Sequence, residues 1–229
     1  MKRKCYTEAA YFLGLILLAV ATAMMEKANF GMSMVVAPAY LIHLKLVKIW
    51  PFFSFGMAEY TLQAFLLVLM MLILRRFRLS YLLSFVTAVL YGFMLDGAIA
   101  LFAPVPCASF AARMFFYLAG MVICALSISL LFHTYLPPEA YELFVKEVSG
   151  AFGLEIHRCK TAYDCISCAV SVALSFLFFG LWQFEGVKLG TVFCALINGW
   201  LISRWTHLIE KHFDFSDAFQ LRHSRLFEG

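Results

Sequence analysis

The amino-acid sequence predicts an all-α transmembrane protein: a six-helix bundle built from two inverted three-helix repeats, each with a short amphipathic or re-entrant helix. Three observations lead to this prediction. Hydrophobic residues make up 63% of the 229 residues and charged residues only 14%, whereas soluble domains carry about 25% charged residues. The apolar residues are gathered into long runs, as lipid-facing helices require. Two polar stretches, residues 29–59 and 133–164, interrupt the runs, one in each half.

In the first half of the chain, the pattern predicts three membrane-spanning helices and one shorter segment. The spans are expected at residues 9–25, 59–74 and 81–101. The shorter segment, residues 34–50, is apolar but contains Pro38 and several basic or titratable side chains. Such a segment is typical of a helix that lies in the membrane interface or re-enters the membrane.

The second half repeats this order. Spans are expected at residues 114–132, at 164–184, and from residue 187 or 191 to 205, with a tight turn before the last. Residues 138–152 carry apolar side chains near helical spacing and charged ones between them. This pattern predicts a short amphipathic helix on the membrane surface.

The distribution of Lys and Arg indicates the orientation. Thirteen of the eighteen Lys and Arg residues lie in the two termini, with Arg204 at the end of the last span counted among them, and in the connections after the second and fourth spans. Positive charge favours the cytoplasmic side, so we expect a multi-pass protein of the cell (plasma) membrane with both termini cytoplasmic. The first span lacks a cleavage pattern after it and is expected to be retained.

We expect residues 1–229 to form a single membrane domain. Repeat one would cover about 9–106, repeat two about 113–209, and 210–229 would be a polar cytoplasmic tail. Residues of the same kind recur at similar spacing in the two halves: Gly14 with Gly120, Glu59 with Asp164, and Gly92 with Gly199. An odd number of spans per half would give the second half the opposite orientation, as in many secondary transporters. The alternative is that six spans divide into two threes in any case, and that the glycines match by chance.

Short motifs add a resemblance to a known family. They are Ala28-Asn29-Phe30-Gly31 after the first span, Asp164, which we place at the start of the fifth helix, and the run from Gly186 to Val192 that leads into the last helix. With the six-span layout, the chain resembles the YczE/YitT-type bacterial integral membrane proteins over about residues 13–204. The resemblance implies a six-span fold and a membrane location, not an activity. The chain departs from that family at Gly199-Trp200, where the family carries Gly-Pro, and in a first loop that lacks Asp.

Polar groups inside spans are costly to bury and are therefore candidates for function. The candidates for substrate or ion binding are Asn29, Glu59, Asp96, Asp164 and Asn198. Each also has a structural interpretation. Glu59 and Asp164 would cap helix starts, Asp96 would lie at headgroup level, Asn198 would bond between helices, and Asn29 would end the first helix. A functional Asp96 would instead be a proton or cation site, or the partner of a basic group such as Arg113.

Other kinds of chemistry find little support. Cys165 and Cys168 have redox or metal spacing, but no second pair accompanies them, and helix packing with Ser167, Ser171 and Ser175 accounts better for this stretch. The sequence contains no nucleophile set, zinc motif or phosphate loop. We therefore expect no enzyme, no cofactor and no metal. The net charge of +4 lies in clusters beside apolar runs, which does not indicate nucleic-acid binding.

The sequence therefore predicts a small-solute transporter or permease with a site at the interface of the repeats. The alternative is a non-catalytic solute-binding or accessory membrane subunit that acts with a partner complex. The expected partners are the lipid bilayer and a small-molecule solute that the sequence does not identify. A homo-oligomer and a membrane partner protein both remain open.

Overall fold

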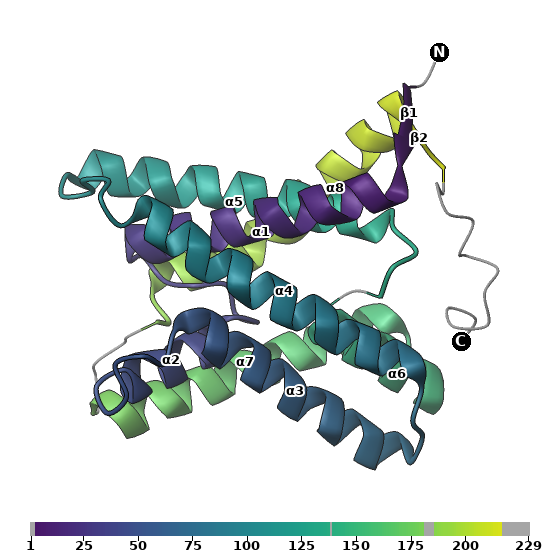
Figure 1. Ribbon diagram of the computed structural model, residues 1–229, viewed down its shortest axis with the longest axis horizontal. Coiled ribbons are helices and arrows are strands. Elements are labelled where there is room, and N and C mark those ends of the chain that lie inside the picture. Colours follow the sequence, from purple (N-terminus) through teal and green to yellow (C-terminus); the bar gives the residue numbers. More distant parts are fainter. Residues whose placement is uncertain (1–2, 138, 181–185, 217–229) are drawn as a thin grey trace.

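A computed structural model describes residues 3–137, 139–180 and 186–216, without the side chains of Arg3, Lys4, Ile156 and His157. The described residues form eight helices and two short strands (Figure 1). In chain order these are β1 (Arg3–Tyr6), α1 (Thr7–Ala28), α2 (Ala37–Leu46), α3 (Phe55–Leu74), α4 (Leu79–Phe102), α5 (Phe110–Phe132), α6 (Ala140–Phe152), α7 (Ile156–Phe179), α8 (Leu189–His212) and β2 (Phe213–Ser216).

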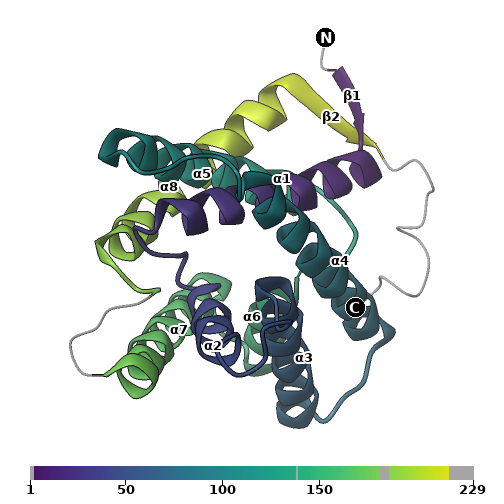
Figure 2. The same cartoon turned by 60° about the vertical axis from the view of Figure 1, so that its left-hand side comes forward.

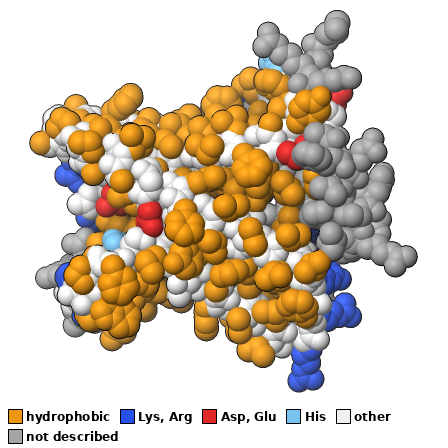
Figure 3. All heavy atoms as spheres, in the orientation of Figure 1, with side chains coloured by type: hydrophobic (Ala, Val, Ile, Leu, Met, Phe, Trp, Pro, Cys, Tyr) orange, Lys and Arg blue, Asp and Glu red, His pale blue; other side chains and the backbone are white. Residues whose placement is uncertain are grey.

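Five of the described helices are long and apolar enough to cross a membrane: α1, α3, α4, α5 and most of α7. Hydrophobic side chains cover most of the face in Figure 3, and Lys and Arg side chains gather toward its two ends. The chain is therefore an α-helical, multi-pass membrane protein. The helix expected as the sixth span, α8, is 24 residues long, but it is not among these five because its second half is polar.

The two halves have the same order of elements. Each half runs long helix, short helix, long helix, long helix, as α1 to α4 and again as α5 to α8. The helix contacts follow this order. In the centre, α1 packs on α5. The contact of α1 with α4 corresponds to that of α5 with α8, and the contact of α2 with α7 corresponds to that of α6 with α3. The match is incomplete, because α3 packs closely on α4 whereas α7 and α8 barely touch. Figure 2 shows α1, α4, α5 and α8 on one side and α2, α3, α6 and α7 on the other.

The crossing of α1 and α5 is reciprocal. A Cβ atom on Gly14 would lie 2.9 Å from the Leu131 side chain, and one on Gly120 would lie 2.9 Å from the Met25 side chain. The Ser127 hydroxyl donates a hydrogen bond of 2.7 Å to the Gly14 carbonyl. The early part of each helix thus meets the late part of the other, so α1 and α5 are antiparallel. The two matched glycines lie at one crossing and let the backbones approach closely.

Two predicted helix starts were wrong. α3 begins at Phe55, where the Ser54 hydroxyl accepts a hydrogen bond of 3.0 Å from the Met57 amide. α7 begins at Ile156 rather than at residue 164. Glu59 and Asp164 therefore lie inside their helices, and the helix-cap interpretation of both carboxylates is wrong. Polar residues fill the first turns of α7, so the apolar run alone marked its start too late.

The strands were not predicted from the sequence. β1 and β2 pair in parallel with Arg3 opposite Phe213, and they bring the two ends of the described chain to the same end of the molecule (Figure 1). The polar tail was expected from residue 210, but α8 continues to His212 before β2 begins. The rest of the expected tail, residues 217–229, lies outside the described residues, as do Pro138 and most of the turn expected before the last helix.

Candidate functional site

A cavity of about 520 Å³ lies between the two halves of the chain. Its walls come from α1, α4 and residues 32–36 in the first half, and from α5, α7, α8, Glu139 and the first turn of α6 (Tyr141 and Glu142) in the second half. Small-molecule sites typically occupy about 300–1,000 Å³. The connection that leads into α2 and the N-terminal end of α6 therefore meet at one central space.

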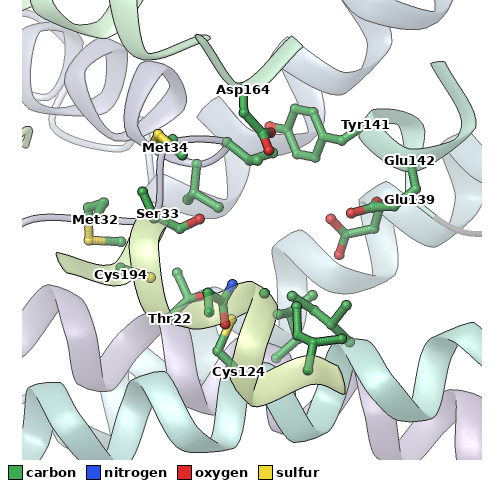
Figure 4. A pocket seen from close by; sticks show the side chains of 18 of the residues that line it. Thr22, Met32, Ser33, Met34, Cys124, Glu139, Tyr141, Glu142, Asp164 and Cys194 are labelled. Atoms are coloured by element: carbon green, nitrogen blue, oxygen red, sulfur yellow. The ribbon is translucent and has the colours of Figure 1, made fainter. Parts of the chain in front are cut away.

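Charged side chains gather in one part of this cavity. Glu139, Glu142, Asp164 and Lys160 line it, and the Lys160 ammonium lies 3.2 Å from Asp164 Oδ1. Figure 4 places Asp164 beside Tyr141, with Glu139 and Glu142 farther along the same side and Thr22 and Cys124 across the space. Apolar side chains supply much of the remaining wall.

Glu139 is the most confined of these carboxylates. It is the N-cap residue of α6, and its side chain is nearly inaccessible to solvent. Its Oε2 atom lies 3.5 Å from the Gln63 amide nitrogen, and its buried Oε1 atom accepts no hydrogen bond from any described residue. Burial raises the pKa of Glu139 well above its ordinary value, and the neighbouring Glu142 and Glu59 carboxylates raise it further. Burial also raises the pKa of Glu142.

Glu59 is fully buried next to the cavity, and two hydrogen bonds join its helix to the start of α6. The Tyr141 hydroxyl donates to Glu59 Oε1 at 3.0 Å, and the Ala140 amide donates to Gln63 Oε1 at 3.1 Å. Tyr141 itself lines the cavity. Glu59 does not line the cavity itself, but it is hydrogen-bonded to Tyr141, which does.

The structure brings three of the five candidate residues together. Asp164 and Asn198 line the cavity, and Glu59 lies behind Tyr141. Asn198 Oδ1 is buried and accepts no hydrogen bond from any described residue, so the expected bond between helices does not form through this atom. Asp164 reaches the cavity because it lies inside α7, not at its end.

Asp96 does not line this cavity. Its carboxylate accepts hydrogen bonds from the Ser54 hydroxyl at 2.5 Å and from the Gly56 amide at 2.8 Å, which ties α4 to the start of α3. The expected pairing of Asp96 with Arg113 is not observed, because the Arg113 guanidinium donates to the Ala28 carbonyl at 2.8 Å. Asp96 is a helix-capping residue here.

Asn29 lies outside the cavity, where the motif Ala28–Gly31 contacts the run from Gly186 to Val192. It ends α1 in the left-handed conformation and accepts a hydrogen bond of 2.7 Å from the Lys188 ammonium. The Met32 amide donates to the Gly186 carbonyl, and the Gly190 amide donates to the Phe30 carbonyl. These hydrogen bonds hold the connection after α1 against the start of α8. Residues 32–36 follow directly and form part of the cavity wall.

Sequence analysis missed Glu139, Glu142, Tyr141 and Lys160. The first two were taken as the polar face of a helix on the membrane surface, and this placement was wrong for the start of α6, which is buried against α3. An amphipathic pattern cannot distinguish a polar face turned toward water from one turned toward an internal polar cavity. The spacing of Glu139 and Glu142, three residues apart and directly after two prolines, was the available signal.

The stretch around Cys165 and Cys168 serves helix packing. Both thiols are free, and neither residue lines the cavity. The nearby Ser167, Ser171 and Ser175 are buried. Among the described residues, no group of three or more His, Cys, Asp or Glu side chains is arranged to hold a metal ion.

Comparison with known proteins gives one match. Residues 5–207 match a family described as "Family of unknown function (DUF6198)". The chain belongs to this family. No curated protein and no solved structure matches the chain. The family description does not mention YczE/YitT proteins, so that resemblance stays a prediction.

Proposed function

We propose that this protein is a small-solute transporter whose site is the central cavity between two inverted repeats. The observation that carries the proposal is the reciprocal, antiparallel crossing of α1 and α5 beside a cavity that both halves line. Two similar halves of opposite orientation around a midplane site are a recurring design of secondary transporters.

Further support for opposite orientation comes from the pairs of packed helices. Exchanging the two halves replaces α1 to α4 by α5 to α8, and the reverse. Under this exchange the packed pair α1–α4 becomes α5–α8, and the packed pair α2–α7 becomes α6–α3, which are packed as well. Gly14 and Gly120 exchange places in the same operation, since each faces the late part of the other helix. Such an exchange requires a two-fold axis across α1 and α5, which reverses the direction of the second half.

The terminal strands support six crossings. β1 precedes the first long helix and β2 follows α8, yet the two strands are neighbours. Polar ends on one side of a membrane require an even number of crossings between them. Five long apolar helices are present, so α8 would supply the sixth crossing, with its polar second half leading out to β2. The Lys and Arg distribution then favours a cytoplasmic location for both termini.

The cavity walls suit a solute that crosses between the two sides. The connection between α1 and α2 (residues 32–36) and the N-terminal end of α6 (Glu139, Tyr141 and Glu142) both reach this space. A small shift of one half against the other would open the space toward one side and close it toward the other, as alternating access requires.

Two-sided access can be measured by cysteine labelling. Ser33 lines the cavity, and Ser33→Cys in a cysteine-free background would be treated with a membrane-impermeant thiol reagent in right-side-out and in inside-out vesicles. A transporter that alternates between two states should be labelled in both kinds of vesicle. The matched control keeps only the native Cys107, which lies in the connection between α4 and α5, and it should be labelled from one side.

Labelling of Ser33→Cys from only one side, with the Cys107 control behaving as expected, would contradict transport by alternating access. That result would favour a solute-binding or accessory subunit with a cavity open to a single side.

A further inference from the structure

We infer that the cavity binds a small organic cation, an ammonium group on an apolar body, and that Glu139 is the carboxylate that pairs with it. This inference deepens the proposed function and rests on it, because it names the class of solute for the same cavity. It is carried by the charges of the lining residues, by the orphaned oxygen of Glu139 and by the apolar character of the remaining wall.

The charged lining residues leave an excess of negative charge. Glu139, Glu142 and Asp164 line the cavity, and Lys160 is the one basic side chain among the described lining residues. Its ammonium is already paired with Asp164 at 3.2 Å. Lys160 also attracts the Glu142 and Glu139 carboxylates, but one ammonium group cannot balance three carboxylates. A buried carboxylate requires a counter-charge or hydrogen bonds to offset its desolvation.

Glu139 is held in place for such a contact. The side chain is 6% exposed, its Oε2 atom lies near the Gln63 amide, and it sits at the N-terminus of α6, where the helix dipole favours negative charge. Its Oε1 atom is buried and accepts no hydrogen bond from the described residues. One oxygen is thus positioned by the protein and the other is left for a donor in the cavity, and an ammonium group supplies three donors.

The rest of the wall argues for an organic cation rather than a metal ion. The described His, Cys, Asp and Glu residues include no group of three or more that could hold a metal. The space of about 520 Å³ is much larger than one ion requires, and its wall includes Leu18, Met25, Val36 and Ile128. Tyr91 and Tyr141 also line it, and aromatic rings attract cations that lie over their faces.

Three probes of one shape and different charge test the inference. Phenethylamine carries the cation, 2-phenylethanol is neutral, and 3-phenylpropionate is an anion. Each would be added at the same series of concentrations to the purified full-length protein, and the melting temperature would be followed. Ligands that bind only the folded state raise the melting temperature with concentration. We expect a rise of a few degrees with phenethylamine and none with the other two.

Glu139→Gln keeps the shape of the side chain and removes its charge. The apparent affinity for phenethylamine, taken from the concentration at which the melting temperature rises, should therefore fall at least tenfold. The control is Glu155→Gln, whose carboxylate lies on the surface in an ion pair with Arg158 and should keep the full response. If Glu139→Gln does not fold, Glu142→Gln gives the same comparison, with a smaller expected loss because that side chain is less confined.

An equal or larger rise with the alcohol or the anion would overturn the cation assignment while leaving a solute cavity in place. An unchanged response to phenethylamine in Glu139→Gln would overturn the role of Glu139. No rise with any probe would also overturn the cation assignment, whereas the labelling of Ser33→Cys from the two sides tests transport independently of these probes.

Discussion

At the scale of single residues, Tyr141 connects the buried Glu59 to the cavity. Both side chains are almost inaccessible, and the Tyr141 hydroxyl lies 3.0 Å from Glu59 Oε1. The other oxygen of Glu59 accepts no hydrogen bond from any described residue. The Gln63 side chain also interacts with this carboxylate. A buried carboxylate with so few donors is sensitive to the loss of the Tyr141 hydroxyl, because a hydrogen bond in a region of low dielectric constant is strong and hard to replace.

We predict that Tyr141→Phe lowers the free energy of unfolding by about 1–3 kcal/mol, the cost of leaving a buried polar group unsatisfied. Tyr60→Phe is the matched control, since Tyr60 lies on α3 next to Glu59 and is only half-buried. It should change stability by less than about 0.5 kcal/mol. Equal losses in the two variants, measured by denaturant unfolding in detergent, would contradict a special role for the Tyr141 hydroxyl.

The raised pKa of Glu139 predicts a pH dependence. The folded protein holds the Glu139 proton more tightly than the unfolded chain does, so stability from this residue is present below about pH 4.5 and is lost as pH rises through the folded pKa. Glu59, Glu142 and Lys160 all influence this carboxylate, and burial is the largest cause of the shift. Glu139→Gln removes the dependence.

We therefore expect Glu139→Gln to gain stability relative to wild type as pH rises from 5 to 8. Melting temperatures at several pH values would measure this difference. Glu155→Gln, altered on the surface, should run parallel to wild type. A constant difference between Glu139→Gln and wild type over the whole range would contradict the pKa shift.

At the scale of helices, the α1–α5 crossing holds the two halves together. Close approach at Gly14 and at Gly120 depends on the absence of a side chain, because a Cβ atom at either position would lie 2.9 Å from a side-chain atom of the other helix. The two contacts occupy equivalent places, so a change at either should have a similar effect.

We predict that Gly14→Val and Gly120→Val each lower the free energy of unfolding by about 1–3 kcal/mol through overpacking. Gly97→Val is the control, because a Cβ atom at Gly97 in α4 would meet nothing within 4 Å. Unfolding in mixed detergent would compare the three variants. A large loss at one matched glycine and none at the other would contradict the reciprocal crossing.

Helix order could be read from the sequence, whereas several helix ends could not. Long apolar runs marked the six long helices, because lipid-facing segments require apolar side chains over a fixed length. A shorter apolar segment marked α2, and an amphipathic pattern marked α6. The start of α7 was placed too late since Arg158, Lys160 and Asp164 lie in its first turns. Lys160 and Asp164 pair with each other and line the cavity, and Arg158 pairs with Glu155 on the surface; only the packed structure reveals these contacts.

The candidate site was predictable only where a polar residue stood alone in an apolar run. Asp164 and Asn198 were found in this way, and both line the cavity. Asp96 gave the same signal but bonds to the start of α3. Glu139 was missed because charged residues are ordinary in an amphipathic segment, and burial of its N-terminal end depends on where α3 lies.

At the scale of the whole molecule, the paired terminal strands constrain the threading. β1 and β2 lie at one end of the bundle (Figure 1), so the account requires both termini on one side of the membrane. The Lys and Arg distribution favours the cytoplasmic side.

Epitope tags at the two termini would test this threading. We predict that a protease removes both tags in inside-out vesicles and neither in right-side-out vesicles. Removal of one tag in each kind of vesicle would mean an odd number of crossings, and it would contradict α8 as a sixth span.

The proposed function requires two halves of opposite orientation that meet at the α1–α5 crossing, and cross-linking in native membranes tests this arrangement. In a cysteine-free background with a protease site between α4 and α5, three pairs would be oxidised: Gly14→Cys with Leu131→Cys, Met25→Cys with Gly120→Cys, and Gly14→Cys with Gly120→Cys. The antiparallel crossing predicts that the first two pairs hold the cleaved halves together on a gel and that the third does not. Cross-linking of the third pair alone would place α1 and α5 parallel, and the inverted arrangement would be wrong.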